Sequence, residues 1–187
     1  MRTSQTNQPE RRTETARPAI AMAGRGHAPR LLRALLAWAG GGWQVCRLEP
    51  DDRRGAAVAS PGDLSWELLE RCVTGGPIGL AVLDLDDPIS RYWEEAGLTP
   101  CITYSENKDR ADLVAKNLTV LPDRSLQFEV LAGGQLSRVR LANGVCTLYE
   151  ALNVMACALA VGIPVSTSAA FFNKLSRKKG EGPCYLL

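Results

Sequence analysis

The chain of 187 residues contains one histidine, His27, and this scarcity argues against sites built on several imidazole groups. A structural zinc site takes its four ligands from cysteine and histidine. The cysteines are widely spaced and form no CxxC pair, so they do not predict such a site. We expect them to be reduced, mostly buried thiols of a cytoplasmic protein. The six are Cys46, Cys72, Cys101, Cys146, Cys157 and Cys184.

Long apolar runs and a strong charge bias are also missing. The longest apolar run, residues 154–165, is shorter than the roughly 20 residues of a membrane-spanning helix, so no membrane association is expected. The formal net charge is only +2 and the basic residues are scattered, which argues against a nucleic-acid partner. Residues 1–17 are polar and predict a disordered tail, and residues 18–187 are expected to form a single domain.

The remaining sequence alternates between short apolar runs and helical patterns. Strands are predicted at 19–23, 43–48, 78–83 and 101–104, and helices at 29–39, 63–73, 89–96, 147–161 and 167–175. Residues 50–60 are expected to form a loop. Three further strands, at 112–121, 125–131 and 136–141, are separated by turn residues and predict an antiparallel meander. We therefore expect an α/β domain whose mainly parallel sheet is flanked by helices and extended by this small meander.

The turn between the first strand and the first helix is the first candidate for chemistry. It reads Gly24-Arg25-Gly26-His27 and lies where a phosphate-binding loop would lie. Such a loop needs a lysine for the terminal phosphates and a hydroxyl for magnesium, and this turn has neither. Pro29 also removes one amide donor. We favour a tight connection over a working nucleotide site, and we interpret His27 as a solvated residue rather than a general base.

A group of carboxylates follows the strand at 78–83. Asp84, Asp86 and Asp87 lie at the carboxyl end of this strand, the edge where α/β proteins bind ligands. Carboxylates in that position could hold a metal or a ribose. Because Asp86 and Asp87 directly precede Pro88 and a predicted helix, we favour helix capping for both.

Several segments carry a family resemblance. Residues 83–88 read L-D-L-D-D-P, 102–105 read I-T-Y-S and 111–117 read A-D-L-V-A-K-N, while 147–163 contain T-L-Y-E-A-L and A-C-A-L-A-V-G-I. Together they resemble the central domain of the Mur ligases, the ATP-dependent UDP-N-acetylmuramoyl-peptide ligases of peptidoglycan synthesis. The branch that adds a diamino acid as the third stem-peptide residue is the most similar. The resemblance implies a shortened central domain over residues 18–187.

The same resemblance implies a vestigial nucleotide site without catalytic residues or metal ligands. Ala28 and Pro29 stand at the positions of the family's phosphate-binding lysine and magnesium-binding hydroxyl. Asp84 occupies the position of a family asparagine that follows the central strand. Thr147 and Glu150 occupy the positions of the two asparagines that hold adenine in the family. The implied site consists of Gly24, Gly26, His27, Asp86, Asp87, Thr147 and Glu150.

These substitutions lead us to expect a degenerate ligase-like protein that does not turn over ATP by itself and has neither ATP nor magnesium as a cofactor. With one histidine, the family's two-histidine element cannot be formed, and residues 48–78 leave little room for its metal-binding segment. The acceptor domain is expected to be absent. Cell-wall ligases are the partners implied by this interpretation. The alternative is a component of an ATP-dependent ligase that is completed by another chain.

Overall fold

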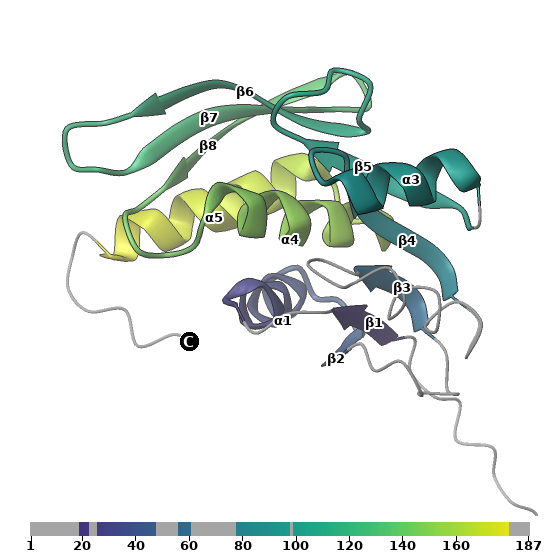
Figure 1. The fold of residues 1–187 in the computed structure, drawn as a ribbon. Coiled ribbons are helices and arrows are strands. Elements are labelled where there is room, and N and C mark those ends of the chain that lie inside the picture. The colour runs from purple at the N-terminus through teal and green to yellow at the C-terminus, as the bar shows by residue number, and fades with distance from the viewer. Residues whose placement is uncertain (1–18, 23–25, 48–55, 61–77, 98, 180–187) are drawn as a thin grey trace, which may run out of the picture.

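One eight-stranded sheet organises the protein, in the strand order β2-β1-β3-β4-β5-β6-β7-β8 (Figure 1). The computed structural model describes residues 19–22, 26–47, 56–60, 78–97 and 99–179. The strands are β1 (Ala19–Met22), β2 (Gln44–Arg47), β3 (Ala56–Ser60), β4 (Ile78–Asp84), β5 (Cys101–Ser105), β6 (Leu113–Val120), β7 (Leu126–Ala132) and β8 (Gln135–Leu141). The helices are α1 (Ala28–Trp38), α3 (Pro88–Ala96), α4 (Leu148–Ala160) and α5 (Val165–Lys179).

The sheet is parallel from β2 to β6 and antiparallel from β6 to β8, which confirms the expected fold class. Two glycines make the β7–β8 turn. Gly133 and Gly134 have φ angles of 55° and 76°, and Ala132 pairs with Gln135 across them. Positive φ at both central residues is the geometry of the two-residue turns that match the twist of a hairpin.

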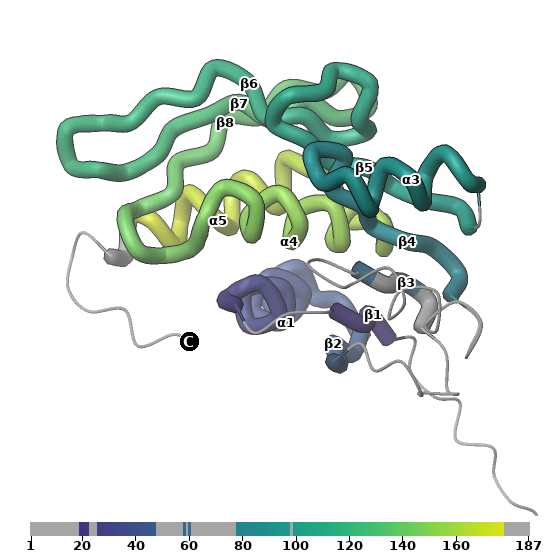
Figure 2. The backbone as a smooth tube through the Cα atoms, in the orientation of Figure 1, coloured from purple at the N-terminus to yellow at the C-terminus, as the bar shows by residue number. Residues whose placement is uncertain are grey.

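Helix α4 forms the centre of the main core. It packs against α1 and α5 and against the sheet at β3 to β6. Figure 2 shows it between the meander of β6–β8, above it in this view, and α1 below it. Leu152, Val154, Met155 and Ala156 are fully buried, as the nearly continuous apolar sequence of the helix predicts. No described helix is long and apolar enough to cross a membrane.

Strand β4 is buried on both faces because helices cover each side. Val82 belongs to the main core under α4. Its neighbours Ala81 and Leu83 pack instead with Trp93 of α3 in a separate cluster. This alternation explains why the strand reads as a continuous apolar run rather than as alternating apolar and polar residues.

The prediction of a loop over residues 50–60 is wrong, because residues 56–60 form β3 between β1 and β4. Its sequence, A-A-V-A-S, contains a single β-branched residue and so gives little local strand signal. Pairing with a strand on each side decides its conformation. The predicted disordered tail and the predicted helix at 63–73 lie outside the described residues.

The outer edge of β8 is covered by side chains of α5. Asn173 Oδ1 accepts from the Arg140 N–H at 2.8 Å, and Asn173 Nδ2 donates to the Arg138 carbonyl at 2.9 Å. Ser176 Oγ donates to the Arg140 carbonyl at 2.6 Å and accepts from the Ala142 N–H at 2.9 Å. Two side chains one helical turn apart thus take the place of a neighbouring strand. Such coverage prevents an edge strand from pairing with another chain.

Removing both side chains should expose this edge. We expect Asn173→Ala/Ser176→Ala to lower the free energy of unfolding by about 1–3 kcal/mol, since four backbone groups lose their partners. Self-association should increase with concentration in analytical ultracentrifugation. Ser166→Ala, at an exposed position of the same helix, is the control and should change neither measurement. A double variant as stable and monomeric as the parent would contradict this role of α5.

Candidate functional site

The carboxyl edge of the parallel sheet brings together residues that lie far apart in the sequence. The turn at Gly26 and His27, which follows β1, meets the start of α4 where the His27 N–H donates to Glu150 Oε1 at 2.6 Å. The end of β4 meets the same helix where Tyr149 Oη lies 3.5 Å from Asp86 Oδ2. The predicted site residues Gly26, His27, Asp86, Thr147 and Glu150 therefore surround one region. Gly24 lies outside the described residues.

Glu150 is bound at the start of two helices. Within α4 it completes a capping box: Thr147 Oγ1 accepts from the Glu150 N–H at 3.2 Å, and Glu150 Oε2 accepts from the Thr147 N–H at 2.9 Å. The other carboxylate oxygen accepts from His27, the N-cap residue of α1, whose own side chain makes no capping bond. One carboxylate thus satisfies donors at both helix N-termini, where negative charge is also favoured by the helix dipoles.

These contacts keep Glu150 ionised. Burial alone would raise its pKa, but the backbone N–H groups of Thr147 and His27, with the charge of the His27 ring, lower the pKa below its ordinary value. The packing around the carboxylate is close. A Cβ atom at position 26 would overlap Glu150 Oε1, so a larger residue there would displace the carboxylate from this position. His27 itself is exposed.

Asp86 anchors the loop after β5 and is not a helix cap. Its Oδ1 accepts from the Ser105 hydroxyl and its Oδ2 from the Glu106 N–H, both at 2.8 Å. Burial would raise the Asp86 pKa, but these bonds hold it below its ordinary value. The capping prediction for Asp86 is therefore wrong. Asp84 pairs in register with Tyr104, so the residues that follow β4 and β5 lie side by side.

Asp87 does cap α3, as predicted. It is the N-cap residue, and its Oδ2 accepts from the Ser90 N–H at 2.8 Å, with Pro88 in the first turn. Asp84 Oδ1 accepts from the Asp86 N–H at 2.9 Å and tightens the turn between strand and helix. The carboxylates at the end of β4 therefore bind backbone amides. Among the described residues, no group of three or more His, Cys, Asp or Glu side chains is arranged to hold a metal ion.

Tyr149 lies above this acidic edge. Burial, together with the negative charges of Asp86 and Glu106, raises the pKa of its hydroxyl to about 12. At neutral pH the group is therefore a phenol that donates a hydrogen bond toward Asp86. It cannot serve there as a general base, since deprotonation would place a second negative charge beside the carboxylate.

A small polar cluster that the sequence did not predict lies behind this edge. Ser60, at the end of β3, donates through its hydroxyl to Asn153 Oδ1 at 2.8 Å, and Cys157 Sγ lies 3.4 Å from the same oxygen. Ser60 and Cys157 are buried, and burial raises the pKa of the Cys157 thiol to about 12, so it is not nucleophilic. The sequence feature that could have indicated this cluster is Asn153, a lone amide in the otherwise apolar centre of α4.

Comparisons with known proteins give two partial likenesses, and no family model matches the chain. Over 103 residues, the chain is 29% identical to the UDP-N-acetylmuramoyl-L-alanyl-D-glutamate–2,6-diaminopimelate ligase of Geobacillus thermodenitrificans (strain NG80-2), covering 54% of this chain and 20% of that protein. A solved structure of a ligase with the same name superposes with a TM-score of 0.61 at 13% identity, over 84% of this chain and 46% of that one. The chain thus spans a fifth to a half of the relatives that it matches.

Truncating Glu150 tests its double capping role. We expect Glu150→Ala to lower the free energy of unfolding by about 1–2 kcal/mol, because both helices lose a cap. Because the folded-state pKa is depressed, this contribution is complete above the ordinary value of 4.5 and is lost as the pH falls through the lower, folded-state pKa. Thermal unfolding of Glu150→Gln between pH 2 and 7 should lack that part of the pH dependence. Glu95→Gln, on the exposed face of α3, is the control.

Proposed function

We propose that this chain is a Mur-ligase-like domain related to peptidoglycan precursor synthesis that does not catalyse ATP-dependent ligation by itself. The relationship is supported by the sequence likeness over 103 residues and by the shared fold, both with proteins named as diaminopimelate ligases. The loss of activity is supported chiefly by one observation. The Glu150 carboxylate binds the N–H of His27 at the start of α1, where a nucleotide-dependent relative needs phosphate.

Electrostatics at this turn disfavour a triphosphate. Phosphoryl transfer depends on positive charge and amide donors around the γ-phosphate and its magnesium ion. Here α1 begins with Ala28 and Pro29, which supply neither a cation, a hydroxyl nor, at Pro29, an N–H. A fixed carboxylate lies beside the turn instead. Two like charges about 4 Å apart repel by roughly 1–4 kcal/mol at effective dielectric constants of 80–20. The described residues therefore do not fit magnesium triphosphate.

The effect on rate should be large because these groups act on one transition state. Removing a single electrostatic donor costs about 10²- to 10³-fold in other enzymes. A domain without the lysine and the hydroxyl should lose on the order of 10³-fold or more. What persists is the sheet and the helices around it, and we propose a binding role for them, with cell-wall ligases as partners.

Nucleotide binding is the first test. Isothermal titration of the full chain with Mg-ATP should give no measurable binding up to millimolar nucleotide, because the Glu150 carboxylate lies at the start of α1 and Ala28 and Pro29 offer no group that binds phosphate or the metal. An active diaminopimelate ligase in the same buffer serves as the positive control. A dissociation constant in the low micromolar range, or release of phosphate from ATP, would refute the proposed loss of activity.

Partner capture separates the proposed binding role from the alternative in which another chain completes the enzyme. The full chain, immobilised and exposed to lysate of its own source, should retain a complete cell-wall ligase that has its own nucleotide-binding loop. Mass spectrometry of the eluate identifies the protein that was retained. Recovery of a chain with an acceptor domain but no nucleotide-binding loop, together with ligase activity in the eluate, would favour the complemented enzyme instead.

A further inference from the structure

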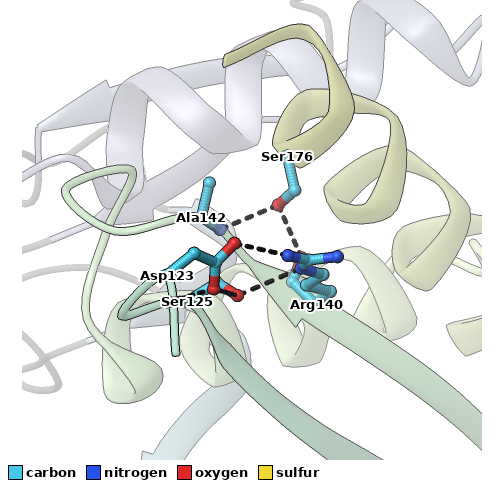
Figure 3. A network of polar contacts seen from close by, with 5 residues as sticks. All are labelled: Asp123, Ser125, Arg140, Ala142 and Ser176. Atoms are coloured by element: carbon cyan, nitrogen blue, oxygen red, sulfur yellow. Dashed lines mark hydrogen bonds and ion pairs between the residues drawn. The ribbon is translucent and has the colours of Figure 1, made fainter. Parts of the chain in front are cut away.

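A second polar region lies between the meander and α5, and none of the candidate-site residues lines it. It is a pocket of about 630 Å³. Figure 3 shows Asp123, Arg140 and Ser176, which line it, together with Ser125, which contacts Asp123 and Arg140. A volume of this size falls within the 300–1,000 Å³ range of small-molecule sites. Its walls carry guanidinium and amide groups, so its preferred ligand must be polar.

Three guanidinium groups line this pocket against one carboxylate, and two of them are held in place. The Arg140 Nε donates to Ser125 Oγ at 3.0 Å and an Nη donates to Asp123. The Arg138 Nη2 donates to Glu129 Oε1 at 3.0 Å. Each guanidinium carries five N–H donors, so both retain donors beyond those that these contacts use. The two side chains are thus oriented without being saturated.

Arg177 provides the excess positive charge. It lies on the exposed face of α5, lines the pocket, and has no hydrogen-bond or ion-pair partner within the part of the chain that the structure describes. Asp123 does not offset it, because that carboxylate is already matched by Arg140. The Ser125 hydroxyl and N–H, with Arg140, lower the Asp123 pKa to about 2. The lining therefore combines two oriented guanidinium groups with one whose charge no other described residue matches.

We propose that this pocket binds a small anionic ligand through a phosphate or carboxylate group, held by Arg177 with the spare donors of Arg138 and Arg140. Planar guanidinium groups match both anions because they can donate two parallel hydrogen bonds. Gln127 adds an amide at the same wall. The proposal is independent of the Mur-ligase relationship, since it uses only the meander and α5.

Titration of the full chain with inorganic phosphate, and separately with citrate, tests this site. Amide NMR spectra at low ionic strength should show saturable shifts around Arg138, Arg140 and Arg177, and sodium chloride at equal ionic strength should not reproduce them. Arg177→Gln should weaken binding about tenfold, the equivalent of one charge-assisted contact. Shifts with phosphate alone identify a phosphoryl ligand, shifts with citrate alone a carboxylate ligand, and shifts with both a general anion site.

A matched variant controls for the simple loss of a positive charge. Arg30→Gln removes a positive charge from an exposed position in the first turn of α1 and should leave the affinity for phosphate and citrate unchanged. Circular dichroism should show that both variants fold as the parent does. The proposal fails if neither anion binds, if Arg177→Gln binds as tightly as the parent, or if Arg30→Gln loses binding with shifts at the start of α1.

Discussion

The arrangement of the carboxyl edge depends on the hydrogen bonds that the Glu150 carboxylate accepts. It binds the backbone N–H of His27 and that of Thr147, and so joins the N-termini of α1 and α4 across 123 residues of sequence. An ionised carboxylate suits this place because both helix ends present unpaired N–H groups and partial positive charge. Glycine at position 26 leaves room for the same carboxylate, because a larger residue there would displace it.

The fold of this protein and the polar contacts at its carboxyl edge depend on different residues. The fold superposes on that of a solved diaminopimelate ligase with a TM-score of 0.61. A fold can persist after its chemistry is lost, because packing depends on apolar burial while catalysis depends on a few polar groups at one edge. In this chain, Glu150 and Asp86 lie at that edge, and both bind backbone amides of their own chain.

Polar side chains also bind backbone groups along β8, the last strand in the sheet order. Asn173 and Ser176 pair with the outer edge of β8. Figure 3 shows Ser176 and, beside it, the contact between Asp123 and Arg140. The meander and α5 are therefore fixed to each other by hydrogen bonds in addition to apolar contacts. The pocket between them has an ordered wall for the same reason.

The sequence by itself determined the features that depend on neighbouring residues. Turn residues such as Gly133 predicted the meander, Asp87 before Pro88 predicted a capped helix, and the apolar run of α4 predicted a buried one. Only the tertiary structure decided that residues 56–60 form β3, that Asp86 binds the loop after β5, and that Glu150 reaches His27. Those outcomes depend on partners that are distant in the sequence, so local propensity and spacing carry no signal for them.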